Sequence, residues 1–357
     1  MRIGVLTGGG DAPGLNAAIR AVVLRSHALG HEVVGIADGW AGLVGEPRTR
    51  ELCPPDVHGI LGLGGTILGT TRTDPRKDGA AAAEVATNIE RIGLDALVAI
   101  GGNDTLGVAD WLQDGGVPVV GIPKTVDNDL AETNYCIGFD TAVTVVAEAV
   151  DRLRTTASAH HRVVVVEAMG RDAGWVAAYG GLTGGADLVI VPEVPVTADD
   201  VVGTIHELRA EGDQDTIIVV AEAAEIAGLE AQAPVDRDAF GHPRLDQRAI
   251  GALVARLVET RAHIEARVVV LGHLQRSGSP TATDRLWATR FGNEAADLVD
   301  ARRFGVLPVA QGGSVDVATL RDAIRTTRRV GDDVLTLLQR FAGIRHQASP
   351  TARIARV

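Results

Sequence analysis

Short apolar runs separated by helical stretches limit the fold of this chain more than any other feature. Continuous apolar strands that alternate with helices are typical of parallel sheets buried on both faces. The sequence therefore predicts an α/β fold with doubly wound sheets, in which ligands bind at the carboxyl ends of the strands. Helices are expected at residues 141–160 and 246–265, among others, and strand-forming runs lie at residues 2–8, 31–38, 96–102, 118–123, 162–170, 186–193, 215–222 and 266–273.

Composition narrows the class of protein further. The 357 residues are enough for two domains with buried cores. Hydrophobic residues make up 46% and charged residues 22% of the chain, as in a soluble globular protein. The net charge of −12 argues against nucleic acid or an anionic membrane as a partner. No apolar run is long enough to span a membrane.

Two further features indicate a cytoplasmic protein. The cysteines, Cys53 and Cys136, lack the spacing of metal ligands and fit a reducing compartment. Residues 1–14 lack the long apolar segment of a signal peptide and are expected to form a first strand and a glycine-rich turn.

Lysine occurs only at Lys77 and Lys124. A lysine kept in a glycine-rich site therefore points to a need for a compact ammonium group.

Residues 6–20, LTGGGDAPGLNAAIR, form the first candidate site. Gly8, Gly9 and Gly10 let the backbone approach a ligand closely. A helix beginning near Leu15 directs its free N–H groups to the same place. A phosphate or pyrophosphate fits this arrangement. A tight turn without a ligand fits it equally, because neither the dinucleotide spacing of glycines nor the lysine of a P-loop is present.

Residues 101–105, GGNDT, form a similar turn after the strand-forming run at 96–102. Asn103 and Asp104 are expected in the first turn of a helix, where phosphates usually bind. A carboxylate is unexpected there, because its negative charge faces a negative ligand. Asp104 therefore raises the question of which phosphate compound the site accepts.

Residues 121–130, GIPKTVDNDL, place two carboxylates beside a lysine and a threonine after another strand. Asp127 is a candidate general base for an attacking hydroxyl group. Lys124, next to Thr125, can offset charge on a transferring phosphoryl group. A solvated turn with an Asx cap would also explain the run from Asp127 to Asp129.

Two clusters that contain arginine follow later strands. In residues 167–177, Arg171 is expected at the start of a helix, where its charge calls for an anionic partner. That partner could be a nearby carboxylate, Asp172 or Asp187, or a ligand phosphate.

In residues 266–285, Arg267 precedes a strand, while His273 and Arg276 follow it about six residues later. If these groups bind one phosphate, some of them must come from another subunit. A lone histidine is more often structural, but the nearby arginines favour an anion site.

These stretches together resemble the 6-phosphofructokinase family. The resemblance implies the phosphofructokinase fold, with two doubly wound, Rossmann-like lobes and the active site in the cleft. It also implies transfer of a phosphoryl group to O1 of fructose 6-phosphate, giving fructose 1,6-bisphosphate. The match is collinear over about residues 1 to 300, through GGGDAPGLNAAIR, GGTILGTTRTDP, GGNDTLG, PKTVDNDL, GFDTA, MGRDAGW, AEAAE and LGHLQRSGSPTATDR.

The resemblance assigns roles position by position. Asp127 matches the general base, and Lys124, Thr125 and Arg171 would act on the transferring phosphoryl group. The donor-binding and donor-selecting residues would be Gly10, Arg72, Gly102, Asn103 and Asp104. Fructose 6-phosphate would be bound by Thr125, Asp127, Asp129, Arg162, Met169, Gly170, Arg171, Glu222, Arg267, His273 and Arg276.

The resemblance also implies an assembly and a division into lobes. Arg162 and Arg267 match a pair that reaches into the sugar site of a neighbouring subunit, so a homodimer or homotetramer with shared active sites is expected. The donor-binding lobe is expected at residues 1–138 and 251–305, the sugar-phosphate-binding lobe at 139–250 and 306–345, and a polar tail at 346–357.

Asp104 and Lys124 indicate the phosphoryl donor within this family. Members that use ATP have glycine at the position of Asp104, which leaves space for the α-phosphate and the ribose. Members that use pyrophosphate have aspartate there and lysine at the position of Lys124, as this chain does. The resemblance therefore implies a pyrophosphate-dependent enzyme of the bacterial type, whose reversible reaction serves glycolysis or gluconeogenesis.

Two positions depart from the family pattern. Asn103 stands where an acidic residue usually helps to hold Mg²⁺, so direct binding of the metal by the protein is expected to be weaker. Asp172 stands beside Arg171, where a neutral or basic residue is common. In addition, residues 210–216, AEGDQDT, lack the basic residues of an effector site, so nucleotide regulation is expected to be weak or absent.

Several alternatives stay open on the sequence alone. An ATP-dependent phosphofructokinase requires Asp104 to swing aside. A sugar-phosphate-binding homologue without catalysis is suggested by Asn103 and Asp172. NAD and lipid kinases share a turn resembling GGNDT but lack the PKTVDND and MGR clusters. Another sugar phosphate, such as sedoheptulose 7-phosphate, also stays open as the acceptor.

Overall fold

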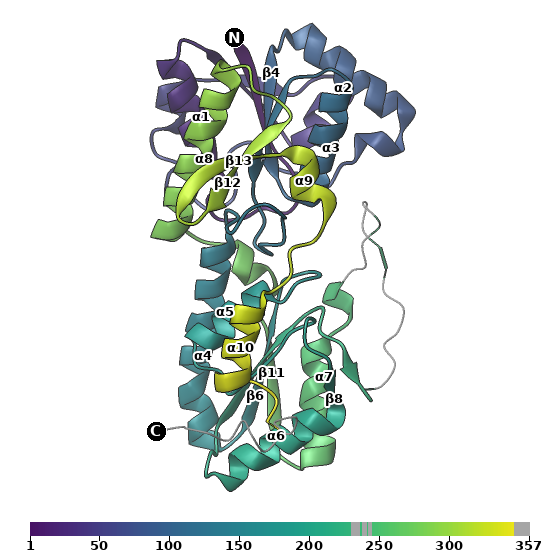
Figure 1. Ribbon diagram of the computed structural model, residues 1–357, viewed down its shortest axis with the longest axis vertical. Coiled ribbons are helices and arrows are strands. Elements are labelled where there is room, and N and C mark those ends of the chain that lie inside the picture. The colour runs from purple at the N-terminus through teal and green to yellow at the C-terminus, as the bar shows by residue number, and fades with distance from the viewer. Residues whose placement is uncertain (230–235, 238–240, 242–244, 346–357) are drawn as a thin grey trace. The chain divides into compact units, whose positions relative to one another are not determined.

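The computed structural model describes residues 1–229, 236–237, 241 and 245–345. The chain divides into two compact units. Unit one is built mainly from Met1–Thr141 and Arg276–Arg328, and unit two from Ala142–Asp236, Pro243–Gln275 and the chain from Arg329 onward. Helix α4, Phe139–His160, takes the chain from the first unit into the second (Figure 1).

Unit one is organised around a mixed sheet. Among the described residues, this sheet has seven strands in the order β13-β12-β5-β4-β1-β2-β3. Its central strands β5, β4, β1 and β2 pair in parallel, whereas β3 and β13 at the two edges are antiparallel to their neighbours. The strands are β1 (Arg2–Thr7), β2 (Glu32–Ile36), β3 (Thr49–Leu52), β4 (Ala96–Gly101), β5 (Val119–Pro123), β12 (Val306–Gln311) and β13 (Ser314–Thr319).

Helices cover both faces of this sheet, which explains why its central strands are apolar throughout. Helices α1 (Leu15–Ala28) and α8 (Ala282–Asp300) lie side by side on one face, and Phe291 and Ile19 are fully buried there (Figure 1). Helices α2 (Gly79–Ile92), α3 (Asn103–Asp114) and α9 (Leu320–Arg325) cover the other face, where Leu106 is buried. Short 3-10 turns join these elements: η1 (Gly39–Leu43), η2 (Pro54–Val57) and η3 (Pro75–Lys77).

Unit two has a smaller parallel sheet. In the described part of this unit the order is β11-β6-β9-β7, formed by β6 (Val163–Ala168), β7 (Leu188–Ile190), β9 (Thr216–Ala221) and β11 (Ala266–Val270). A separate pair of short strands joins β8 (Val196–Thr197) to β10 (Ile226–Ala227).

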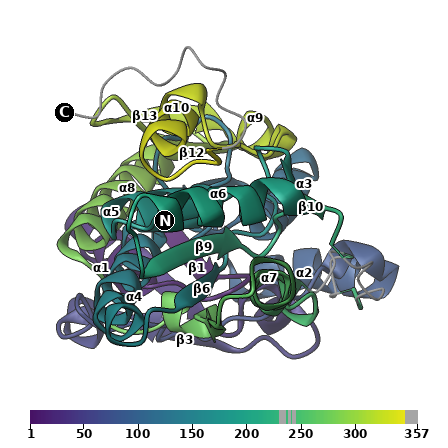
Figure 2. The same cartoon turned by 90° about the horizontal axis from the view of Figure 1, so that it is seen from below.

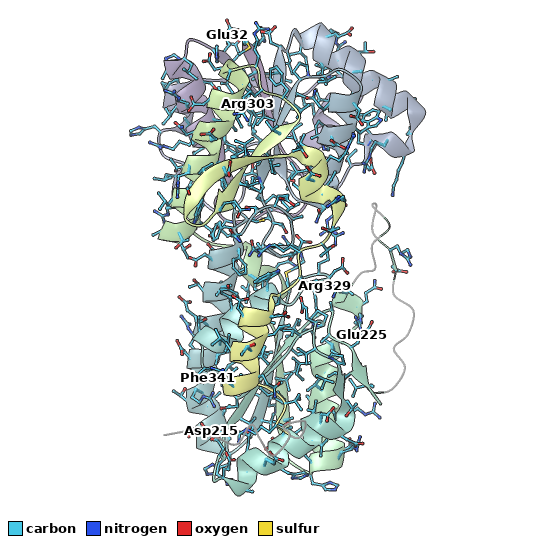
Figure 3. All side chains as sticks on the ribbon, viewed as in Figure 1. Glu32, Asp215, Glu225, Arg303, Arg329 and Phe341 are labelled. Carbon is cyan, nitrogen blue, oxygen red and sulfur yellow. The ribbon has the colours of Figure 1, made fainter. Side chains whose placement is uncertain are left out.

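The helices of unit two pack around this smaller sheet. Helix α7 (Ile250–Leu257) packs against β6 and β11, and its π-helical continuation η5 (Val258–Ala262) contacts α6 (Ala198–Ala210) (Figure 2). Helix α5 (Trp175–Thr183) packs against β7, β9 and α10 (Asp332–Phe341). Phe341, the last residue of α10, is labelled in Figure 3 and is exposed. The 3-10 turns of this part of the chain are η4 (Leu245–Gln247) and η6 (Gly272–Arg276).

The predicted α/β fold is confirmed, and every strand-forming run named from the sequence contains a strand. The boundaries of the units differ from the expected ones. Residues 251–275 belong to unit two because β11 pairs with β6, and residues 306–328 belong to unit one because β12 pairs with β5. In the described ranges, no helix is both long and apolar enough to cross a membrane.

Asp284, near the start of α8, holds the segment that leads into α4. Its Oδ1 accepts hydrogen bonds from the hydroxyl of Tyr135 at 2.7 Å and the N–H of Gly138 at 2.6 Å. Its Oδ2 accepts from the N–H of Thr141 at 2.8 Å and from the hydroxyl of the same residue at 2.5 Å. The carboxyl group is fully buried, and burial raises its pKa. Asp284 therefore organises the segment that follows β5.

We predict that Asp284→Ala lowers the free energy of unfolding by about 3 kcal/mol, because buried donors lose their acceptor. Urea unfolding followed by tryptophan fluorescence measures this change. Glu294→Ala, on the same helix, is the control and should change stability by no more than about 0.5 kcal/mol. Equal losses in the two variants would show that the carboxylate of Asp284 does not organise this segment.

Candidate active site

The turn from Gly8 to Gly10 joins β1 to the segment before α1. The N–H of Gly8 donates to the carbonyl oxygen of Ile100. The hydroxyl of Thr70 donates to the carbonyl oxygen of Gly9 at 2.7 Å. A Cβ atom at Gly8 would lie 2.6 Å from Oγ1 of Thr105, so the close approach of the turn to α3 requires glycine. The predicted helix start at Leu15 is confirmed. The turn therefore lies against the N-terminal part of α3, as a phosphate-binding turn would.

Lys124 follows β5 and reaches into this turn. Its Nζ donates to the carbonyl oxygens of Gly8 at 3.0 Å and Gly10 at 2.5 Å. The side chain is buried, and burial lowers its pKa to about 7, with the positive charge of Arg276 acting in the same direction. The carboxylates of Asp127 and Asp11 act in the opposite direction. An anionic ligand at this turn would favour the ammonium form.

Arg276 lies on the same turn. Its Nη1 donates to the carbonyl oxygen of Asp11 at 3.1 Å, and a Cβ atom at Gly10 would lie 2.9 Å from that nitrogen. The residue is 8% exposed, and its Nε is buried without a hydrogen-bond partner among the described residues. Arg72, which is exposed, also influences Lys124 electrostatically. The structure thus gathers three cations around the glycine-rich turn, which is the chemistry of an anion site.

The loop after Lys124 holds the candidate base. The hydroxyl of Thr125 donates to Oδ2 of Asp127 at 3.2 Å, and the N–H of Asp127 donates back to that hydroxyl at 3.2 Å. Asp127 is 5% exposed, and its Oδ1 is buried with no hydrogen-bond partner in the described part of the chain. A buried acceptor without a donor is costly unless a ligand supplies one. The geometry therefore suits a substrate hydroxyl that donates to Oδ1.

Asn128 and Arg328 hold this loop in place, and neither role was predicted from the sequence. Asn128 has a left-handed backbone, with φ 52°, and its Oδ1 accepts the N–H of Cys136 at 2.8 Å. The guanidinium of Arg328 donates to the carbonyl oxygens of Asn128 at 2.8 Å and Asn134 at 3.3 Å. The N–H of Arg328 also donates to the carbonyl oxygen of Asp129 at 2.7 Å. Asparagine tolerates left-handed φ, which was the only signal in the sequence.

Helix α3 begins beside this loop, as predicted for Asn103 and Asp104. Gly102 precedes it, and a Cβ atom there would lie 3.5 Å from the carbonyl oxygen of Lys124. The amide nitrogen of Asn103 donates to Oδ2 of Asp129 at 3.3 Å. The first turn of α3, with its N–H groups and Asp104, therefore belongs to the same cluster as Lys124.

The oxygens that could bind a divalent cation in this cluster are few. In the ranges that the structure describes, no group of three or more His, Cys, Asp or Glu side chains is placed to hold a metal ion. Mg²⁺ commonly binds through one or two carboxylates, substrate phosphates and several waters. In this mode, Asp129 would supply a carboxylate oxygen and Asn103 its neutral amide oxygen, although the Asn103 group that faces Asp129 in the structure is the amide nitrogen. Asn103 alone would supply no charge.

In unit two, Met169, Gly170 and Arg171 form a turn after β6. Oε1 of Glu222 accepts the N–H groups of Gly170 at 3.2 Å and Arg171 at 3.0 Å. Gln275, which is fully buried, accepts the N–H of Met169 at 3.2 Å and donates to the carbonyl oxygen of Gly272 at 3.2 Å. Gln275 was not predicted. It connects the turn to η6, the element that contains His273.

The prediction that Arg171 begins a helix is wrong, since α5 begins at Trp175. Arg171 lies in the turn with φ 50°, and the N–H of Ala173 donates to the carbonyl oxygen of Gly170 at 3.1 Å. These bonds and those to Glu222 close the turn before the helix can begin. Of the two carboxylates considered as its partners, Asp172 is exposed and Asp187 pairs with Arg154 at 2.7 Å.

Arg162 and Arg267 lie together at the opposite end of the sheet in unit two. Both guanidinium groups donate to the carboxylate of Glu265. The distance from Nε of Arg162 to Oε2 of Glu265 is 3.1 Å. The prediction that Arg267 precedes the strand is wrong, since Arg267 is the second residue of β11. His273 lies beyond the other end of the strand, in η6, and the strand from Arg267 to Val270 alone spans about 10 Å. Within unit two, the predicted pair is therefore brought together, but away from His273.

Comparison with known proteins gives consistent matches. Residues 2–299 match the family model for phosphofructokinase. A pyrophosphate–fructose 6-phosphate 1-phosphotransferase from Amycolatopsis methanolica is 49% identical over 92% of this chain and 96% of its own length. The ATP-dependent 6-phosphofructokinase 3 of Streptomyces coelicolor is 46% identical over 93% of this chain and 97% of its own. The solved phosphofructokinase of Saccharomyces cerevisiae superposes with a TM-score of 0.78 at 29% identity, covering 91% of this chain and 45% of the yeast chain.

We predict that Lys124 makes stability depend on pH. Its pKa is about 7 in the folded protein and 10.5 ordinarily, so between these values the unfolded chain binds a proton that the folded chain lacks. The contribution of Lys124 to the free energy of unfolding therefore rises with pH across this window, and below pH 7 its buried charge is unfavourable.

Urea unfolding at several pH values, without phosphate ligands, measures this effect. The stability of the wild type relative to Lys124→Met should rise from pH 7 to 10.5. Lys77→Met replaces the other lysine of the chain, which is exposed, and its difference from the wild type should stay flat. A flat difference for Lys124→Met would contradict the prediction.

Proposed function

Because this chain belongs to the phosphofructokinase family, we propose that it transfers a phosphoryl group from pyrophosphate to O1 of fructose 6-phosphate, giving fructose 1,6-bisphosphate. Relatives of similar identity are named for pyrophosphate and for ATP, so their names alone do not choose the donor. The observation that supports pyrophosphate is the buried ammonium of Lys124 on the glycine-rich turn, with Asp104 in the adjoining first turn of α3.

In this reaction, the donor would bind at the turn from Gly8 to Gly10. Lys124, Arg72 and Arg276 offset the negative charge of its phosphates, and the N–H groups at the start of α3 add hydrogen bonds. The carboxylate of Asp104 disfavours a further phosphate beyond the second. The sequence also assigned Arg276 to the 6-phosphate of the sugar, and that assignment stays a prediction. Its hydrogen bond to the carbonyl oxygen of Asp11 favours a role at the donor turn instead.

Asp127 would act as the general base. Its buried Oδ1 accepts the hydrogen bond, and then the proton, of the attacking O1 hydroxyl group. Thr125 fixes the other carboxylate oxygen through its hydroxyl group. Mg²⁺, held by Asp129 and Asn103 together with the phosphates and water, would neutralise charge on the transferring group. Lys124 and Arg171 would add positive charge to the same group.

The residues of unit two would bind the sugar phosphate. Met169, Gly170 and Glu222 are proposed to contact the sugar, and His273 the 6-phosphate. The contacts from Glu222 and Gln275 to the backbone of the turn support this assignment, because they keep the turn in one conformation.

We further propose that Arg162 and Arg267 bind the sugar phosphate of a second copy of the chain. They lie on a surface beside the edge strand β11, where Val268, Val270 and Leu274 are 39%, 56% and 61% exposed. Exposed apolar groups next to paired charges are typical of a subunit interface. A homodimer or homotetramer in the cytoplasm, working in glycolysis or gluconeogenesis, accords with this proposal.

The initial rate of fructose 1,6-bisphosphate formation tests the function. Fructose 6-phosphate and Mg²⁺ are supplied with either pyrophosphate or ATP as the donor. Turnover with pyrophosphate and little with ATP is expected. Turnover with ATP alone would establish the ATP-dependent alternative. If neither donor reacts while fructose 6-phosphate still binds, the chain is a sugar-phosphate-binding homologue.

We predict that Asp127→Asn lowers kcat by about 10³-fold, because general base catalysis typically contributes 10²–10⁴. Equilibrium binding of fructose 6-phosphate, measured by calorimetry, should change little. An active Asp127→Asn variant would remove Asp127 from the role of base.

We also predict that Arg328→Met lowers kcat by roughly 10- to 100-fold, because the loop that positions Asp127 loses its clamp. Arg329→Met replaces the neighbouring, exposed arginine, which Figure 3 labels, and should leave kcat unchanged. Equal effects in the two variants would mean that Arg328 does not position Asp127.

A further inference from the structure

Arg76 is anchored to a buried carboxylate in η3. Asp74 accepts the N–H of Arg76 at 3.1 Å, and its two carboxylate oxygens accept the Nε of Arg76 at 2.8 Å and the Nη2 at 2.9 Å. The side chain of Asp74 is only 6% exposed, whereas that of Arg76 is 35% exposed. A two-pronged contact of this kind fixes the direction of the guanidinium plane.

The guanidinium of Arg76 rests on helix α3. A Cβ atom at Gly107 would lie 3.3 Å from Nη1 of Arg76, 3.9 Å from Nη2 and 4.0 Å from Cζ. Any residue larger than glycine at position 107 would therefore meet the guanidinium. Asp104 lies three residues earlier, on the same face of α3 as Gly107. Hydrogen bonding to Asp74 raises the pKa of Arg76, and the charge of Asp104 acts in the same direction.

These contacts cover the part of α3 that follows the donor turn. Gly102 adjoins Lys124 at the start of the helix, Asp104 follows in the first turn, and Arg76 covers Gly107 in the second. A nucleotide carries a third phosphate, a ribose and a base beyond the two phosphates that pyrophosphate has. If it extends along α3, it meets Asp104 first and then Arg76. Pyrophosphate has none of these parts.

We propose that Arg76, anchored by Asp74, selects the donor together with Asp104, by covering the surface of α3 that the nucleoside part of a nucleotide would need. This inference rests on the proposed function. The guanidinium of Arg76 offsets part of the negative charge of Asp104. Exclusion of a nucleotide therefore depends on the space that the Arg76 side chain fills over Gly107, as well as on repulsion between Asp104 and a phosphate. Arg76 acts on specificity rather than on the transfer step.

If both residues exclude the nucleotide, the effect of removing Arg76 on the use of ATP depends on whether Asp104 is present. Asp104→Gly alone leaves Arg76 over Gly107, so use of ATP rises little. Arg76→Ala alone leaves the charge of Asp104 without that guanidinium, so use of ATP also rises little. Both changes together clear the surface. We predict that the double variant has a kcat/KM for ATP roughly 10-fold above that of Asp104→Gly.

The experiment compares kcat/KM for pyrophosphate and for ATP, with fructose 6-phosphate and Mg²⁺, in the wild type, the two single variants and the double variant. Arg91→Ala, made alone and in the Asp104→Gly background, is the matched control, since Arg91 is an exposed arginine of unit one that pairs with Glu46 at 3.1 Å. In each background, its donor preference should equal that of the parent protein. Circular dichroism confirms that each variant is folded.

Asp74→Asn gives a second route that keeps the Arg76 side chain. Loss of the anchoring carboxylate should release the guanidinium, and in the Asp104→Gly background it should raise kcat/KM for ATP in the same direction as Arg76→Ala. This variant decides the matter if removal of Arg76 prevents folding.

Three outcomes would overturn the inference, and they are distinct from failure of the proposed function. If the wild type uses pyrophosphate, a double variant with the same kcat/KM for ATP as Asp104→Gly would show that Arg76 does not exclude the nucleotide. A fall in kcat/KM for ATP in Arg76→Ala would show that Arg76 binds the nucleotide. Equal gains from Arg91→Ala would show a non-specific effect of charge. A wild type that does not use pyrophosphate would refute the proposed function itself.

Discussion

The hydrogen bonds from the buried ammonium of Lys124 to the carbonyl oxygens of Gly8 and Gly10 connect the ends of two parallel strands of unit one. Burial of a cation is unfavourable unless carbonyl oxygens, carboxylates or a ligand compensate for lost water. Here two carbonyl oxygens accept from Nζ, while Arg276 and Arg72 add like charge nearby. This turn is therefore prepared for a strongly negative ligand, and the start of α3 and the loop that contains Asp127 adjoin it.

The loop after Lys124 shows how the backbone frame serves the chemistry. Asn128 takes a left-handed conformation between two aspartates, and Arg328 holds its carbonyl oxygen and that of Asn134. In the same loop, one buried carboxylate oxygen of Asp127 has no donor among the residues that the structure describes. The loop is thus fixed by residues that do not touch the reacting atoms, which is how precise positioning is usually achieved.

Much of this arrangement was predictable from the sequence, because strand ends and glycine-rich turns are local patterns. The parallel strands, the helix starts at Leu15 and Asn103, and the cluster around Lys124 and Asp127 follow from such patterns. The antiparallel edge strand β13 and its neighbour β12 did not, because Pro308 and the polar residues of β13 weaken the apolar signal. Arg328 and Gln275 were missed because their contacts join residues far apart in the chain.

The selection of pyrophosphate over nucleotides as the phosphoryl donor is tested most directly in the reverse reaction. Fructose 1,6-bisphosphate is incubated with inorganic phosphate and Mg²⁺, and the products are followed by ³¹P NMR. The account predicts a growing pyrophosphate resonance, and no ATP when ADP replaces phosphate. Formation of ATP from ADP, without pyrophosphate from phosphate, would contradict it.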